Sequence, residues 1–140
     1  MSVKPFSSNE IASYTCYRTP EPITIDGRLE EAAWRAAPES PRFVDIVSGG
    51  PALHDTRSSL LWDDQYLYVS FRIEEPHVRA ELTNRDDIIF MENDIEVFID
   101  GGDTYYEFEL NALNTIYEVF FIWQYQDYLI PKRELSPPLY

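Results

Sequence analysis

The chain has 140 residues, of which 44% are hydrophobic, and this length suits one packed domain. A single cysteine excludes an internal disulfide and a zinc site of clustered thiolates. Acidic residues outnumber basic residues by 25 to 11, and the formal net charge of −14 repels phosphate backbones and anionic lipid surfaces, so neither nucleic acid nor a membrane is an expected partner.

The distribution of proline and of hydrophobic residues predicts three segments. Residues 1–19 show no sustained period and predict an N-terminal arm with at most one edge strand. Residues 20–126 hold the regular hydrophobic patterns of a domain, and residues 127–140 form a Pro-rich tail. The first residues lack the apolar core of a secretory signal, and no stretch approaches the roughly 20 apolar residues of a membrane span. We therefore expect a cytoplasmic protein if residue 1 is the native start.

The first predicted element within the domain is a short helix over residues 29–37. This stretch is rich in Leu, Glu and Ala and stops before Pro38. We expect Trp34 to close one end of the core. Residues 43–47 alternate and predict a strand, which ends at the turn-forming residues 48–51.

Two hairpins are predicted next. Residues 58–62 and 66–73 flank the turn 63–65, and one face of the second strand, expected to be buried, carries Leu67, Val69, Phe71 and Ile73. Residues 94–100 and 105–111 flank the turn 101–103. One face of this second hairpin carries Ile95, Val97, Ile99, Tyr106, Phe108 and Leu110, and the opposite face carries Glu96, Glu107, Glu109 and Asn111.

A further strand is predicted over residues 116–125. Short strands at regular spacing, separated by turn residues, are typical of sandwiches. The predicted fold class is therefore all-β, a two-sheet antiparallel β-sandwich with one short helix near residues 29–37.

Four stretches, in their order and spacing, resemble the family 9 carbohydrate-binding modules. They are Ile23-Thr24-Ile25-Asp26-Gly27 with Glu30, Glu31 and Trp34; residues 61–69 (LWDDQYLYV); residues 93–100 (NDIEVFID); and residues 106–111 (YEFELN). The similarity covers about residues 20–125 and is closest to the broad group of family 9-like proteins. It implies a β-sandwich that holds sugar in a cleft between stacking aromatic and polar side chains, often with structural calcium.

The resemblance also implies roles for individual positions. Glu96 and Asn111 match polar residues of the family's sugar site, Phe90 falls near the first sandwiching tryptophan, and Glu109 stands where an arginine is expected. The family domain usually continues past the point where this chain ends and carries a second sandwiching tryptophan there. We therefore expect a one-sided clamp and open sheet edges that allow self-association.

The expected function is non-catalytic recognition of a saccharide in a cleft on one sheet, because carboxylates and amides bind hydroxyl groups and aromatic rings pack on sugar rings. The candidate saccharide-binding residues are Phe90, Glu96, Glu107, Glu109, Asn111 and Trp123. Three alternatives remain open: a solvated face with Arg72 as counter-charge, a structural or assembly sandwich that has lost sugar binding, and part of a glycoside-processing enzyme that uses two of these acids.

Carboxylates in the predicted loops suggest Ca²⁺, which prefers hard oxygen ligands. The candidate ligands are Asp63, Asp64, Asp86, Asp100 and Asp103. Ordinary polar turns are the alternative interpretation, since no EF-hand spacing is present. His54 and His77 are isolated, so no transition-metal set or nucleophilic triad is predicted.

Overall fold

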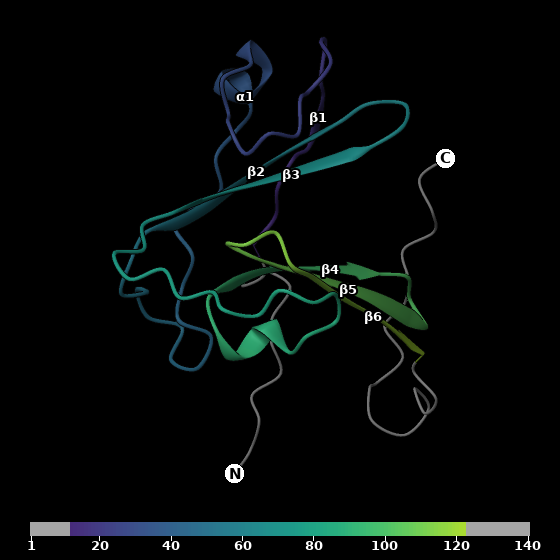
Figure 1. The fold of residues 1–140 in the computed structure, drawn as a ribbon. Helices are drawn as coiled ribbons and strands as arrows, with labels where there is room; N and C mark the ends of the chain where they lie inside the picture. Colours follow the sequence, from purple (N-terminus) through teal and green to yellow (C-terminus); the bar gives the residue numbers. More distant parts are fainter. Residues whose placement is uncertain (1–11, 123–140) are drawn as a thin grey trace, which may run out of the picture. The chain divides into compact units, whose positions relative to one another are not determined.

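A computed structural model describes residues 12–122 (Figure 1). The chain divides into one unit that ends at Pro76 and a second that begins at His77. Within the described residues, each unit contains one three-stranded sheet, and the pairing is antiparallel except for one short parallel strand. The predicted all-β class is confirmed. Two mostly antiparallel sheets are the elements that the predicted β-sandwich requires.

The sheet of the first unit has the order β1-β2-β3. Strand β1 (Tyr17–Arg18) pairs in parallel with β2 (Thr56–Trp62), and β2 pairs antiparallel with β3 (Leu67–Ile73). The Asp63 side chain closes the hairpin, because its Oδ1 accepts hydrogen bonds from the backbone N–H groups of Gln65 at 2.8 Å and Tyr66 at 2.9 Å.

The predicted helix is present as α1 (Ala32–Ala36). The carboxylate of Glu21 accepts a hydrogen bond from the Ala33 N–H at 2.8 Å, which satisfies one of the donors that a helix start leaves unpaired. Trp34 and Ala33 pack with Leu61 of β2 and Tyr68 of β3 to form the core of this unit. Trp34 therefore lies in the core, as the sequence predicted.

The buried face of β3 is not the predicted one. Tyr68 and Ser70 are buried, whereas Leu67 and Ile73 are about half exposed. The physical reason is the position of the helix: Tyr68 and Leu61 are register partners, and Trp34 packs on the face that they share. Alternation alone does not indicate which face a helix will cover.

The strand predicted over residues 43–47 is also wrong. Only a single bridge, Val44 to Pro51, is present there. Asp45 Oδ1 accepts hydrogen bonds from the backbone N–H of Ser48 at 2.7 Å and from its hydroxyl at 2.6 Å, and this local bonding replaces a strand ladder with a turn. Ile46 and Val47 are exposed as a result.

The second unit contains the 3-10 turn η2 (Ile89–Met91) and the sheet β4-β5-β6. Its strands are β4 (Asp94–Asp100), β5 (Thr104–Asn111) and β6 (Ile116–Ile122). Ile95 pairs with Leu110 and Glu96 with Glu109, so the predicted division of this hairpin into an apolar and an acidic face is confirmed. Within the described residues, β3, β4 and β6 each pair on one side only, and self-association through such edges stays a prediction.

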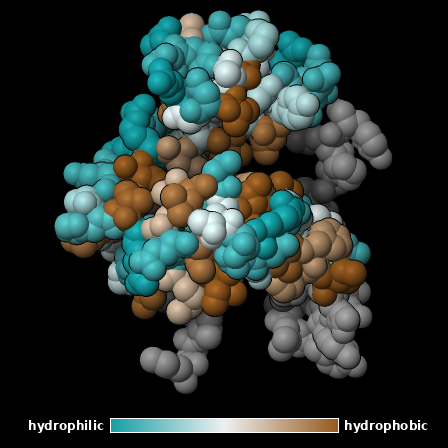
Figure 2. Space-filling model, viewed as in Figure 1, coloured by the Kyte–Doolittle hydropathy of each residue, from teal (hydrophilic) through white to brown (hydrophobic). Residues whose placement is uncertain are grey.

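The cores of the two units are small. Hydrophobic residues reach the surface at many places among hydrophilic ones (Figure 2), and within residues 12–122, 21 large hydrophobic side chains are at least 40% exposed. Each buried large side chain therefore carries a large share of the stability. No helix in residues 12–122 combines the length and apolar character needed to cross a membrane.

Candidate functional site

One face of the β4–β6 sheet gathers four carboxyl groups, which we call the acidic face: Asp94, Glu96, Glu107 and Glu109. Residues two apart on a strand share a face, and Glu96 lies directly opposite Glu109 in the register. Side-chain oxygens of Asp94, Glu96 and Glu109 all lie within 4.8 Å of one another. Like charges directly opposite one another on paired strands are destabilising, so this arrangement needs a compensating feature.

The three clustered carboxyl groups differ in exposure. Glu109 is 1% exposed, Asp94 is half-buried and Glu96 is exposed. Burial raises the pKa of Glu109 to about 8, with a hydrogen bond to Glu107 and the nearby negative charges adding to the effect. Burial, together with the charge of Glu96, raises the pKa of Asp94 to about 6. The carboxyl group of Glu109 is therefore mostly protonated at neutral pH.

No basic residue of the described chain forms an ion pair with the acidic face. Arg72, the counter-charge in the solvated-face alternative, lies in the first unit and pairs with Glu39 at 3.0 Å. Arg85 of the second unit pairs with Glu118, which lies on the opposite face because it is the register partner of Phe108.

Asn111 lies on the same face, but its amide is fully used. Its Nδ2 donates to Leu82 O and to Glu92 Oε1, each at 2.9 Å. Its Oδ1 accepts from the backbone N–H groups of Leu113 at 3.0 Å and Thr115 at 2.9 Å. Four bonds are the full capacity of an amide side chain. Asn111 therefore holds the segment that contains Leu82 and Glu92, and the β5–β6 turn, against the sheet.

One aromatic group borders the acidic face at the η2 end. Ile89 is completely buried, and η2 packs against β5. The ring of Phe90 meets that of Tyr117 edge-on, with centroids 5.7 Å apart, and Tyr117 is the β6 partner of Glu109. Phe90 itself is 48% exposed.

A second aromatic group borders the other end. Tyr105 and Phe121 stack with their centroids 4.5 Å apart, and Phe98 lies 6.1 Å from Tyr105. Phe98 is the register partner of Glu107. Sequence reasoning missed Phe98 and Phe121, although the period of two already places Phe98 beside Glu96. The acidic face therefore lies between two aromatic groups.

The remaining predicted site residues are scattered. Trp123 lies outside the described residues. Asp63 Oδ2 accepts a hydrogen bond from the Tyr68 hydroxyl, Asp64 pairs with Arg18 at 2.6 Å, and Asp100 Oδ1 accepts from the Gly102 N–H. Asp86 has a positive φ of 64° and Asp103 is exposed. Across residues 12–122, the only three-carboxylate cluster is that of Asp94, Glu96 and Glu109.

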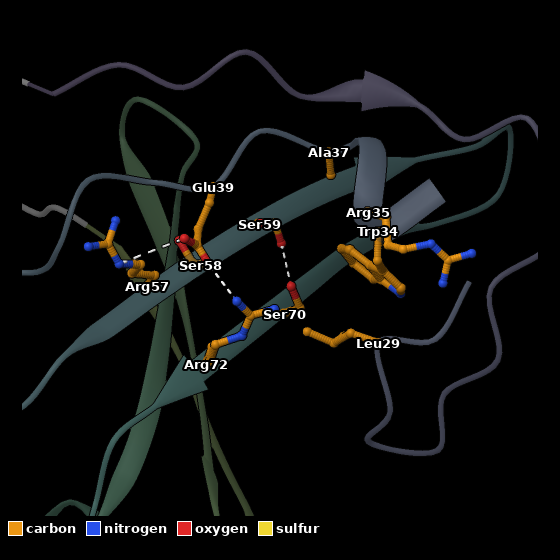
Figure 3. A pocket seen from close by; sticks show the side chains of 10 residues that line it. All are labelled: Leu29, Trp34, Arg35, Ala37, Glu39, Arg57, Ser58, Ser59, Ser70 and Arg72. Atoms are coloured by element: carbon orange, nitrogen blue, oxygen red, sulfur yellow. Dashed lines mark hydrogen bonds and ion pairs between the residues drawn. The ribbon is translucent and has the colours of Figure 1, made fainter. Parts of the chain in front are cut away.

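The first unit contains a separate hollow of about 200 Å³ beside Trp34 (Figure 3). Glu39 lies between two guanidinium groups, 3.0 Å from Arg72 and 3.7 Å from Arg57. Arg57 also pairs with Asp55 at 3.1 Å. The positive charges of this hollow are therefore largely neutralised by residues of the same unit.

Comparison with known families places these features in context. The family model described as carbohydrate family 9 binding domain-like matches residues 25–120. The chain therefore belongs to this family. The match includes the Asp26-Gly27 turn, α1, and nearly all of the β4–β6 sheet, so the resemblance found in the sequence is confirmed. No curated protein and no solved structure matches the chain.

Membership in the family 9-like group indicates carbohydrate binding at the level of the family, whose domains are generally non-catalytic binding modules. The acidic face of this family 9-like domain contains the two positions, Glu96 and Asn111, that match the family's sugar site by resemblance. Glu109 occupies the position where that resemblance expects arginine. By that resemblance, this member lacks one positive charge at a central position of the face.

Proposed function

We propose that this family 9-like domain binds a saccharide, without cleaving it, over the acidic face of the β4–β6 sheet. The observation that carries the proposal is the placement of carboxylates between two partly exposed aromatic groups. Sugar rings present C–H groups that pack on aromatic faces, and their hydroxyl groups donate hydrogen bonds to carboxylates. A sheet face with both kinds of group, one beside the other, suits this ligand class.

The residues of the face have different roles in this proposal. Glu96, which is exposed, and Glu107, which is half-buried, accept hydrogen bonds from the sugar hydroxyls. Phe90 and Phe98, each about half exposed, provide the stacking surfaces. Asn111 is a positioning residue, since its amide is saturated by protein groups. An open face of this kind implies weak binding, in the micromolar to millimolar range or roughly −8 to −4 kcal/mol.

The burial of Glu109 supports a non-catalytic role. Its raised pKa is a property expected of the general acid in a glycosidase, where two carboxyl groups flank the bond that is cleaved. A side chain that is 1% exposed does not reach a glycosidic oxygen of a bound sugar. The pair Glu96 and Glu109 therefore lacks the accessible acid that glycoside cleavage requires.

We expect Glu96→Ala to weaken binding of a saccharide selected on a glycan array. Loss of a hydrogen bond to a charged acceptor costs about 1.5–3 kcal/mol, which corresponds to a rise in Kd of about 10- to 150-fold. Isothermal titration calorimetry of the full chain measures this change. Glu81→Ala is the matched control, because the Glu81 side chain is 76% exposed and lies off the sheet in the same unit.

Two results decide the proposal. A folded Glu96→Ala variant that binds the selected saccharide as tightly as the parent protein would place the sugar elsewhere. If no saccharide is bound on the array and none raises the melting temperature, the domain is a structural or assembly sandwich, because a ligand that binds only the folded state must stabilise it.

A further inference from the structure

The cluster of Asp94, Glu96 and Glu109 has a property that a neutral sugar does not explain. Three carboxyl groups have oxygens within 4.8 Å of one another, and no basic side chain of the described residues pairs with them. Hydroxyl groups donate hydrogen bonds but carry no positive charge. Within the described residues, the electrostatic repulsion in the cluster is relieved only by protons or by a cation.

A second observation concerns individual atoms. Glu109 is 1% exposed, and its Oε2 is buried without a hydrogen-bond partner, as is Oδ2 of Asp94. A buried polar atom with no partner costs about 1–3 kcal/mol, and more where it is charged. The side chain of Glu109 points into the cluster, since one of its oxygens belongs to it. The cluster therefore offers unused acceptor capacity at a fixed, buried position.

We propose that Asp94, Glu96 and Glu109 form a binding site for a hard divalent cation of the Ca²⁺ class. Ca²⁺ binds oxygen ligands at about 2.3–2.6 Å, so two ligands on opposite sides of one ion lie up to about 5.2 Å apart, and the three side chains are close enough to share an ion. The donor set consists of oxygen alone, which favours Ca²⁺ over metals that select nitrogen or sulfur. Glu96 opens the site to water, which completes the six to eight ligands that Ca²⁺ takes.

This site differs from the loop positions suggested by the sequence. Asp63, Asp64 and Asp100 are occupied by turn hydrogen bonds or an ion pair, whereas the sheet cluster holds unpartnered oxygens. The inference goes beyond sugar binding and does not depend on it.

The test uses the full chain, freed of metal by a chelator and then dialysed, with CaCl₂ alone as the probe. Calorimetry at pH 7.5 is expected to show one saturable site, and Ca²⁺ is expected to raise the melting temperature.

The variants Glu109→Gln and Asp94→Asn are each expected to lower the Ca²⁺ affinity at least tenfold, and Asp103→Asn, an exposed loop carboxylate, is expected to leave it unchanged. Circular dichroism checks that each variant is folded. If Glu109→Gln does not fold, Asp94→Asn provides the test. The proposal is overturned if the parent protein shows no saturable Ca²⁺ binding up to millimolar concentration, or if a folded cluster variant binds as the parent does. Because no saccharide is present, each of these results leaves the sugar proposal unaffected.

Discussion

Glu109→Gln is expected to stabilise the metal-free protein at pH 8 by about 2–4 kcal/mol, since each unit of pKa difference corresponds to about 1.4 kcal/mol. The glutamate is held among Asp94, Glu96 and Glu107, and its pKa in the folded state is about 8, above that of an unfolded chain. Its contribution to stability is therefore fully present at acidic pH below the unfolded pKa and is lost as the pH rises toward 8. Glutamine has nearly the same shape but carries no charge, so the free energy of unfolding of the variant does not decrease through ionisation at this position.

Chemical denaturation from pH 4 to pH 9 in the presence of a chelator measures this effect. The parent protein and Glu109→Gln should have similar stability near pH 4 and diverge between about pH 5 and pH 8. Glu81→Gln, on an exposed side chain of the same unit, should follow the parent curve. A Glu109→Gln curve parallel to that of the parent across this range would show that the buried carboxyl group does not titrate as described.

Trp34→Ala is expected to destabilise the protein by about 3–5 kcal/mol, the usual cost of removing a buried tryptophan. Trp34 is 9% exposed and packs against Leu61 and Tyr68. Few large side chains are buried in the described part of the first unit. The side chains around Trp34 therefore cannot fill the cavity that its removal leaves. We expect urea unfolding at low temperature, monitored by far-ultraviolet circular dichroism, to show a much lower urea concentration at the midpoint of unfolding, or a first unit that is unfolded without urea.

Arg35→Ala is the matched control for this prediction. Arg35 follows Trp34 in α1, but it is exposed and makes its hydrogen bond with the Glu30 carbonyl. Surface changes of this kind usually alter stability by no more than about 0.5 kcal/mol. If Trp34→Ala were no more destabilising than Arg35→Ala, the packing of α1 on the sheet would be unimportant to the fold.

Local patterns predicted the β4–β5 hairpin well. A strand alternates its side chains between two faces, and this rule alone places Ile95 and Val97 on one face and Glu96 on the other, as the register confirms. These features depend on residues that are close in sequence, so they are accessible without a structure.

The burial of Glu109 was not accessible in this way. It depends on an irregular segment, with no periodicity to interpret, which is held against β5 by the bonds of Asn111 to Leu82 and Glu92. Sequence reasoning therefore grouped Glu109 with Glu96 and Glu107 as equivalent carboxylates. In the structure one is buried, one is half-buried and one is exposed.

Aspartate residues in turns are a second reason why the sequence alone did not predict the structure fully. Asp45 and Asp63 each accept hydrogen bonds from backbone N–H groups two or three residues ahead. Such side chains compete with the strand ladder, and the same oxygens are also suitable calcium ligands. Composition does not distinguish these uses, and for this reason the sequence predicted a strand at residues 43–47, where the structure has a turn.

The parallel pairing of β1 with β2 has a consequence for the order of folding. The two hairpins close through short turns, whereas Arg18 and Asp64, which pair at the β1 end of the sheet, are 46 residues apart in sequence. Closing a long loop costs more conformational entropy than closing a short turn, and this cost precedes the stabilising contacts. Contacts between residues that are distant in sequence therefore slow folding. We expect the hairpins to form first and β1 to dock last. The amide proton of Thr19, bonded to the Trp62 carbonyl at 2.8 Å, should then exchange with solvent faster than those in the centre of β2.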